Sequence, residues 1–419
     1  LRKMASDAGL VFNQAHAPFP GWRVGDDAYN AKMPERVVRA VKIAGMLGAK
    51  AVVVHPIAVP GGGEKQKEFN LNYYRDMEKV ALDYGTKIAL ENMWGWDGRR
   101  SYIVPNVCSF GEDLCDYYDE LNPDAYFGQK SWEKGESAMQ QFALSRAMEK
   151  GGITAEEVDC VLAGDLLNQC IGTSFGLRDF KIPFYGLYGA CSTMGESLSL
   201  AALLIDGGFA SIVAAMTSSH FCTAERQYRM PVLYGNQRTP TAQWTATASG
   251  CCILSRRGDG PYITHVTCGR IVDLGIKDAN NMGAAMAPAA YDTLSAVLRE
   301  THTTPEDYDL ILTGDLGELG RDIVADFFRE DGIDLGRRYT DCGLLLYDRE
   351  EQDMHAGASG CGCSAAVLSG YVLRGMRAGR WKKVLFAPTG ALLSPTSSFQ
   401  GESIPGICHA VVISSKKEN

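Results

Sequence analysis

The chain has 419 residues, of which 46% are hydrophobic and 22% charged, and its formal net charge is −9. This composition is that of a globular protein long enough for two or more domains, and it excludes a disordered tail. The acidic balance, without a cluster of Lys and Arg, argues against nucleic-acid binding.

No run of about 18 uninterrupted apolar residues is present, and the opening stretch "LRKMASDAGL" lacks the apolar centre of a signal peptide. We therefore expect a soluble, unsecreted protein whose membrane contact, if any, is peripheral. Thirteen cysteines are scattered without regular spacing, mostly in apolar contexts. Reduced thiols in a cytosol-like compartment fit this pattern best.

From residue 9 onward, short apolar runs alternate with amphipathic segments. "GLVFNQAHA", "AKAVVVHP" and "KIALENM" predict strands, whereas "PERVVRAVKIAGMLG" and "NYYRDMEKVALDYG" predict helices. This βα alternation predicts a parallel sheet. The predicted strand ends carry His16, His55 and Glu91, at the edge where barrel enzymes keep their chemistry.

A different organisation begins near residue 128, and the chain contains an internal duplication. "ITAEEVDCVLAGDLL" (153–167) aligns with "TTPEDYDLILTGDLG" (303–317), which places Asp165 on Asp315. Only two long copies are present, so they predict one duplicated α/β domain rather than a solenoid. The predicted halves are about 128–258 and 259–419.

The duplication continues further along the chain. "CSTMGESLSLAALLIDGGFASIVAAMTSS" aligns with "CSAAVLSGYVLRGMRAGRWKKVLFAPTGA", so that Cys191 falls on Cys363. The second half also has a strand-like opening, "PYITHVTCGRIVDLGI" (261–276). The equivalent window of the first half, 111–126, is acidic and turn-like. The first half is therefore predicted to lack its opening strand.

Cys191 follows Gly189 and Ala190 and opens a predicted helix. A thiol at a helix N-terminus experiences the positive end of the helix dipole, which lowers the pKa and suits a nucleophile or an anion-binding position. A small buried residue in a crowded turn is an equally good interpretation, because free cysteine is commonly buried and inert. The residues alone leave both interpretations open.

Other candidate residues follow the predicted strands of the first half. His220 comes directly after the strand of "AAMTSSH" and can donate to a carboxylate, carry a charge, or simply be a structural histidine. Asp165 can orient His220, bind backbone N–H groups or bridge through Ca²⁺. Alternatively, Asp165 has only a structural role, because the same turn geometry could require Asp at this position in both halves. Arg226 and Arg229 form a possible carboxylate clamp, or are surface or ion-paired arginines.

Residues 128–415 resemble the stage V sporulation protein AD family, which are dipicolinate-binding proteins with a thiolase-like fold. The resemblance rests on "GQKSWEKGE", "LAGDLLNQ", "LYGACST", "AERQYRMPVLYG", "GRIVDLGI", "LILTGDLG" and "SGCGCSA", all in order. It implies an α/β, duplicated thiolase-like domain that lacks its first strand. It also implies that Asp165, Cys191 and His220 line the dipicolinate pocket.

The function implied by this resemblance is binding of dipicolinic acid, with Ca²⁺, during sporulation. The chain would help deliver the ligand across the spore inner membrane together with channel-forming stage V sporulation proteins, without catalytic turnover. A location in the cytoplasm or peripheral to that membrane follows. A homodimer is expected only by analogy with thiolase folds.

Residues 1–127 resemble the xylose-isomerase-like epimerases and isomerases, which have a TIM barrel; "ALENMWGWDGRRSYIVPNVCSF" is the most telling run. Glu91 matches the first carboxylate metal ligand of that family, and the later ligands belong to strands that this chain does not reach. The segment is therefore expected to be a partial barrel, fused at "NPDAYF/GQKSW". Glu91, His16 and His55 would then be vestigial.

Two enzymatic alternatives stand beside the binding function. The first is an acyl-transferring, thiolase or ketoacyl-synthase-like enzyme that uses Cys191 as nucleophile. Such enzymes need a base and an oxyanion donor, normally His with Asn or a second His, and "TGDLGELG" and "AGASGCGCSAA" carry neither at the expected place. The second alternative, a metal-dependent sugar isomerase working through residues 1–127, lacks the later ligands.

Overall fold

The computed structural model describes residues 2–417, except 9–10, 13, 19–22, 24, 56, 58–62, 91–116, 229–237 and 351. The chain divides into two compact units, Leu1–Ile103 and Val104–Asn419, whereas the sequence pattern places the change of organisation at residues 127 and 128. Residues 117–127 belong to the second unit: Tyr117 packs edge-on against Tyr371, and the carbonyl oxygen of Ala125 accepts a hydrogen bond from His220.

The first unit is a small α/β structure. Its parallel sheet has the order β1-β2-β3, as the βα alternation predicts. Helix α3 has Pro34 in its first turn and is followed by Gly48, whose φ of 85° provides the left-handed C-cap. No closed barrel is formed by the part of this unit that the structure describes. The elements are α1 (Arg2–Asp7), β1 (Gln14–His16), α2 (Asp27–Asn30), α3 (Met33–Leu47), β2 (Ala51–Val54), α4 (Gly63–Asp83) and β3 (Lys87–Leu90).

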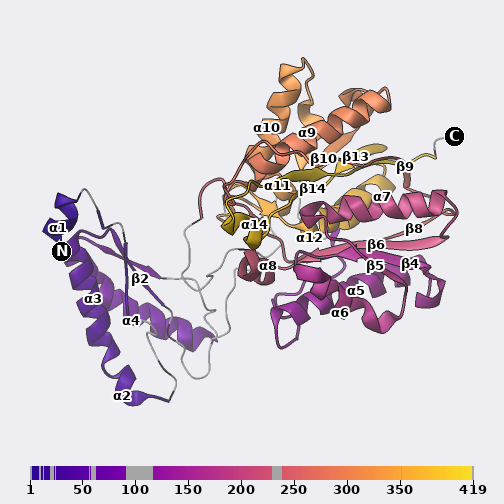
Figure 1. Ribbon diagram of the computed structural model, residues 1–419. Coiled ribbons are helices and arrows are strands. Elements are labelled where there is room, and N and C mark those ends of the chain that lie inside the picture. Colours follow the sequence, from indigo (N-terminus) through magenta and orange to yellow (C-terminus); the bar gives the residue numbers. More distant parts are fainter. Residues whose placement is uncertain are drawn as a thin grey trace. The chain divides into compact units, whose positions relative to one another are not determined.

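The second unit has five layers (Figure 1): helices α5 and α6, a first sheet, helices α7 and α12, a second sheet, and helices α9 and α10. The elements before the second sheet are α5 (Trp132–Gly151), β4 (Cys160–Gly164), α6 (Ile171–Leu177), β5 (Phe184–Gly186), α7 (Thr193–Asp206), β6 (Ile212–Ser219), α8 (Phe221–Tyr228), β7 (Trp244–Thr245) and β8 (Ala248–Ser255).

The elements that follow are β9 (Tyr262–Thr267), α9 (Met282–Glu300), β10 (Leu310–Thr313), α10 (Gly317–Glu330), β11 (Tyr339–Asp341), α11 (Cys342–Leu346), β12 (Ala358–Ser359), α12 (Cys361–Ala366), α13 (Leu373–Arg377), β13 (Lys383–Ala387), β14 (Thr389–Ala391), α14 (Pro395–Phe399), β15 (Gly406–Cys408) and β16 (Ala410–Ser414). A π-helical turn, Val367–Val372, joins α12 to α13.

The two sheets of the second unit have the same order of strand directions. The first has the order β5-β4-β6-β8, in which β5, β4 and β6 are parallel and β8 is antiparallel. The second has the order β11-β10-β13-β16-β9, in which β11, β10 and β13 are parallel, and β16 and β9 follow in antiparallel pairs. Of the five described strands in the second sheet, β9 is the one that has no equivalent among the described strands of the first sheet.

The central strands are apolar because helices cover both of their faces. Every residue of β4 and β10 is buried, and the main core between the sheets includes Met194 and Leu198 of α7. Helix α5 is preceded by Ser131, whose hydroxyl caps the Lys134 N–H, and is followed by Gly152 in the left-handed conformation. None of the helices in the described ranges combines the length and apolar character needed to cross a bilayer.

Candidate functional site

Strand ends and helix starts of the second unit meet in one buried cluster. Asp165 directly follows β4, and Asp315 follows β10 after one glycine. Cys191 lies in the 3₁₀ turn that precedes α7, and Cys361 begins α12. The side chains of Cys191 and Cys361 both interact with Asp315, and that of Cys361 also interacts with Asp165.

Cys191 is only 8% exposed and packs with Leu166, Ala224 and Cys361. Burial raises the pKa of its thiol well above the ordinary value, and the nearby Asp315 carboxyl, to which the thiol is hydrogen-bonded, raises it further. The sequence argument from the helix dipole is wrong about the direction of this shift, because burial and the carboxyl outweigh the dipole. Cys191 is therefore held as a neutral thiol.

Cys191 is expected to resist alkylation in the folded protein. Iodoacetamide attacks thiolates, so at pH 7.5 the exposed Cys268 should be modified at least about a hundredfold faster than Cys191. Peptide mapping by mass spectrometry after timed quenching measures both rates in one sample. In denaturant the two cysteines should react alike, and equal rates in the native protein would contradict a buried neutral thiol.

Asp315 is fully buried and surrounded by donors. Its carboxylate accepts hydrogen bonds from the Ser359 hydroxyl at 3.0 Å, the Gly360 N–H at 3.1 Å and the Thr389 hydroxyl at 2.9 Å. Burial raises the pKa of Asp315, and these hydrogen bonds oppose the shift. Asp315 thus joins β10, α12 and β14 behind Cys191.

Asp165 and Glu136 form a second pair of buried acids. Asp165 accepts hydrogen bonds from the backbone N–H groups of Leu167 (2.8 Å) and Thr173 (2.7 Å), so it binds backbone, as one interpretation of the sequence expected. Burial raises the pKa of Asp165. Burial also raises the pKa of Glu136 to about 8, and the charge of Asp165 contributes. Glu136 is therefore largely neutral at pH 7.

Glu136 is the centre of a network that the sequence analysis missed. It accepts hydrogen bonds from Ser218 (2.8 Å) and Thr223 (2.9 Å), while Gln140 donates to Ser218 at 2.6 Å. Glu136 and Gln140 continue the buried stripe of α5 at the spacing of Leu144. Polar residues at i and i+4 in line with a buried leucine were the signal that could have found them.

His220 is 2% exposed and neutral. Its Nδ1 accepts a hydrogen bond from the Cys222 N–H at 3.1 Å, so the proton lies on Nε2, which donates to the carbonyl oxygen of Ala125 at 2.7 Å. Burial lowers the pKa of His220 to about 4. The positive charge that the sequence analysis considered is absent at pH 7, since an imidazolium would lose its solvation here.

The arginine pair is described only in part. Arg226 forms an ion pair with Glu133, and its guanidinium lies 5.3 Å from the centre of the Trp132 ring. It is thus an ion-paired surface arginine, the second of the two interpretations. Arg229, like Glu91, lies outside the described residues.

A polar rim of Tyr188, Tyr228, Gln227 and Asn168 adjoins Cys191 through Leu166. The hydroxyls of Tyr188 and Tyr228 are 3.1 Å apart, and Tyr228 donates to the carbonyl oxygen of Leu166. Gln227 donates to Asn168 at 3.2 Å. Tyr188 is 47% exposed, so this rim presents polar groups at the surface, and its hydroxyl and amide donors bind Leu166, Asn168 and one another. Sequence reasoning missed these residues, since only the fold brings them beside Cys191.

In the first unit, Nε2 of His16 and Nε2 of His55 lie 2.9 Å apart, at the ends of β1 and β2. Within the described ranges, no group of three or more His, Cys, Asp or Glu side chains is arranged to hold a metal ion.

Comparison with known proteins gives two family matches. The family model of stage V sporulation protein AD matches residues 106–414, and that of the xylose isomerase-like TIM barrel matches residues 1–123. Stage V sporulation protein AD of Bacillus subtilis (strain 168) is 45% identical over 295 residues, which are 70% of this chain and 87% of that protein.

Solved structures with a similar α/β fold include condensing enzymes. The tetronic acid condensing enzyme AbyA1 is 16% identical with a TM-score of 0.46, and the match covers 73% of this chain and 90% of that one. The 3-oxoacyl-[acyl-carrier-protein] synthase III from Aquifex aeolicus VF5 is 12% identical with a TM-score of 0.45, covering 66% and 84%.

Proposed function

Because this chain belongs to the stage V sporulation protein AD family, we propose that it binds dipicolinate during sporulation and assists its transport into the spore. It acts at the spore inner membrane with channel-forming stage V sporulation proteins, and it does not turn the ligand over. The observation that carries this proposal is the 45% identity over 295 residues.

The state of Cys191 supports binding rather than acyl transfer. A cysteine nucleophile reacts as the thiolate, whereas burial and Asp315 hold Cys191 as the thiol. The same neutrality suits an anionic ligand, because a thiolate beside Asp315 would repel the carboxylates of pyridine-2,6-dicarboxylate. Neutral Glu136 removes a further negative charge from this region.

In the proposed complex, the flat ring of the ligand lies against Cys191 and Leu166. Its carboxylates meet the polar rim, where the hydroxyl of the exposed Tyr188 turns from Asn168 to donate to them. Asp165 holds the turn that carries Leu166. Calcium comes with the ligand, since its two carboxylates supply the oxygen atoms that this cation prefers.

His220 and Arg229 complete the proposed site. His220 positions α8, since its ring accepts from the Cys222 N–H and its carbonyl oxygen accepts from Ala224. Arg229 follows α8 directly in the sequence and remains the candidate carboxylate clamp.

Isothermal titration with dipicolinate, with and without Ca²⁺, tests this function. We expect saturable binding by the wild type, and a loss of at least about tenfold in affinity for the Cys191→Ala, His220→Ala double variant. The matched control is Cys268→Ala, His302→Asn, which changes one exposed cysteine and one exposed histidine. Absence of binding by a demonstrably folded wild type would refute the proposal.

The proposal extends to the origin of the fold. We take residues 128–419 as a duplicated thiolase-like domain and residues 1–127 as a partial TIM barrel. In support, both sheets have the same order of strand directions, and buried Asp165 and Asp315 follow the equivalent strands β4 and β10. An experimental structure in which the two halves fail to superpose would contradict this view.

A further inference from the structure

The first sheet of the second unit ends at β8, and within the described part of the chain no strand pairs with its outer edge. Asp159 donates its N–H to the carbonyl oxygen of Ile212 at 2.9 Å. The backbone N–H and C=O groups of Ile212 and of every second residue of β6 therefore face β4. The residues between them, beginning with Val213, point toward β8. Val213 is paired with Leu254.

The backbone N–H and C=O groups of successive β8 residues therefore alternate between facing β6 and facing the open edge. Those of Gly250, Cys252 and Leu254 face β6, whereas the N–H and C=O groups of Cys251 and Ile253 face the open edge. Unpaired backbone groups along a strand edge are a template for a further strand.

The second sheet shows what occupies such an edge. There β16 takes the place of β8, and β9 pairs with it antiparallel, from Ser414 opposite Tyr262 to Ala410 opposite Thr267. Both strand faces are covered by helices in each sheet, so the natural occupant of the edge is a strand of about six residues.

A cavity of about 1340 Å³ lies along the open edge of β8. All residues of β8 line one side of it, and 117–125 line another. Its remaining walls include apolar side chains from the two covering helical layers, among them Met139 and Phe142 of α5 and Leu373 of α13, together with charged side chains. The cavity thus combines unpaired backbone with apolar walls, which is what an added strand requires.

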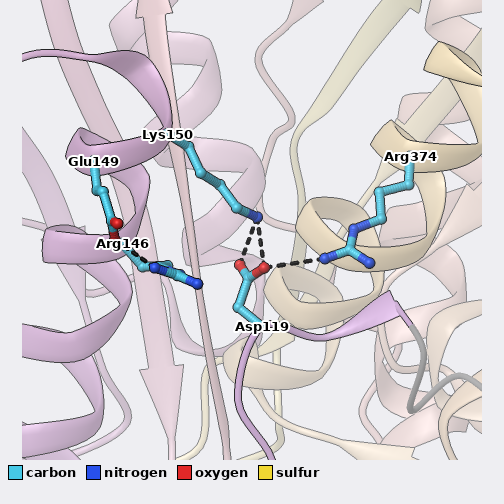
Figure 2. A network of polar contacts seen from close by, with 5 residues as sticks. All are labelled: Asp119, Arg146, Glu149, Lys150 and Arg374. Carbon is cyan, nitrogen blue, oxygen red and sulfur yellow. Dashed lines mark hydrogen bonds and ion pairs between the residues drawn. The ribbon is translucent and has the colours of Figure 1, made fainter.

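Contacts at both ends hold the segment 117–125 without pairing it to β8. At one end, the Asp119 carboxylate binds Nζ of Lys150 at 2.6 Å and the Arg374 guanidinium at 3.0 Å (Figure 2), so it links α5 to α13. At the other end, the Ala125 carbonyl oxygen accepts from His220. The segment is fixed as a wall of the groove, and none of the described strands occupies the edge.

Charge favours one kind of occupant. If an added strand has the same direction as β9, its first residue lies opposite Ser255, next to Arg256 and Arg257. Basic side chains lining the cavity exceed acidic ones, seven to five: Arg146, Lys150, Arg256, Arg257, Arg374, Arg377 and Lys417 against Asp119, Glu120, Asp124, Asp206 and Asp259.

We propose that the open edge of β8 is a docking site for a partner protein that adds one antiparallel strand to the first sheet. The partner contributes an extended, uncharged segment of about six residues rich in β-branched and aromatic side chains, with acidic residues at its N-terminal end. This inference is independent of dipicolinate binding.

A labelled peptide tests the proposal on the full chain. The probe is fluorescein-labelled DDPYITHVT, in which residues 261–267 of this chain follow two aspartates. By the pairing of β9 with β16, His265 and Thr267 are the residues whose amides face the edge. We expect saturable binding by fluorescence anisotropy. N-methylation at these two positions should weaken binding at least about tenfold, whereas N-methylation at Thr264 and Val266 should not.

The protein side of the contact is tested by Ile253→Pro, which removes an amide that faces the open edge and spares the bonds to β6. The peptide should bind at least about tenfold more weakly to this variant and unchanged to Ile253→Val. Hydrogen exchange of the wild type provides a test without any variant: the amides of Cys251 and Ile253 should gain protection on adding peptide, those of Cys252 and Leu254 being protected already. No binding by folded wild type, or equal binding of both methylated peptides, overturns the proposal.

Discussion

Replacing Asp341 by asparagine is expected to destabilise the second unit by about 2–6 kcal/mol, because two buried donors lose their acceptor and each such donor costs about 1–3 kcal/mol. Asp341 ends β11 and is fully buried. One carboxylate oxygen accepts from the Thr313 hydroxyl (2.7 Å) and the Leu316 N–H (3.0 Å), and the other from the N–H groups of Gly317 (3.0 Å) and Gly343 (2.9 Å).

The asparagine amide cannot replace this carboxylate in either orientation. Its NH₂ group faces either the Thr313 hydroxyl and the Leu316 N–H, or the N–H groups of Gly317 and Gly343, so a backbone N–H at the start of α10 loses its acceptor in both orientations. Since whole domains are stable by only about 5–15 kcal/mol, a large part of the protein should fail to accumulate in soluble form.

Thermal unfolding by circular dichroism, together with soluble yield, measures the effect of Asp341→Asn. Asp326→Asn is the matched control, because Asp326 is exposed and its contact is a surface ion pair with Arg329 that contributes little. A melting temperature of Asp341→Asn equal to that of the control would show that the four hydrogen bonds are not needed.

The sequence predicted those features that depend on local pattern. Apolar runs followed by Gly-Asp predicted the buried strands β4 and β10 and placed Asp165 and Asp315 at their ends. The acidic window at 111–126 predicted that the first half lacks a strand, and this stays a prediction because residues 111–116 lie outside the described part of the chain.

The features that the sequence missed depend on partners far along the chain. The pKa of Cys191 is set by burial and by Asp315 rather than by its own helix. The neutrality of His220 follows from burial, which lowers its pKa and outweighs the opposing effect of the hydrogen bond to the carbonyl oxygen of Ala125, 95 residues away. Glu136 was passed over because a glutamate in a helix is normally solvated, and only Ser218 and Asp165 reveal its buried environment.

Glu136 should make the protein less stable as pH rises, and Glu136→Gln should remove that dependence. Burial raises the folded-state pKa of Glu136 to about 8 from the ordinary 4.5. Below pH 4.5 both states are protonated, and between pH 4.5 and 8 the unfolded chain releases a proton that the folded one keeps. Stability is therefore lost at up to about 1.4 kcal/mol per pH unit across this window.

Glutamine preserves the hydrogen bonds of the neutral acid, unlike asparagine at Asp341. Its carbonyl oxygen accepts from Ser218, and its NH₂ group donates to the Thr223 hydroxyl, whose own proton can go to the carbonyl oxygen of His220 at 3.0 Å. The variant should consequently fold normally at pH 5 and gain about 2–4 kcal/mol over the wild type by pH 8.

Urea unfolding of wild type and Glu136→Gln at pH 5 and pH 8 measures this gain. Glu149→Gln is the matched control, since it removes a carboxyl of the same helix that is paired with Arg146 at the surface and should leave the pH profile of the wild type unchanged. Asp165, whose pKa burial also raises, keeps some pH dependence in the variant, so its profile should flatten without becoming level. Parallel profiles for wild type and Glu136→Gln would mean that Glu136 is already ionised in the folded protein. The charge of the Glu136 carboxylate, beside Asp165, would then be stabilised only by the hydroxyls of Ser218 and Thr223.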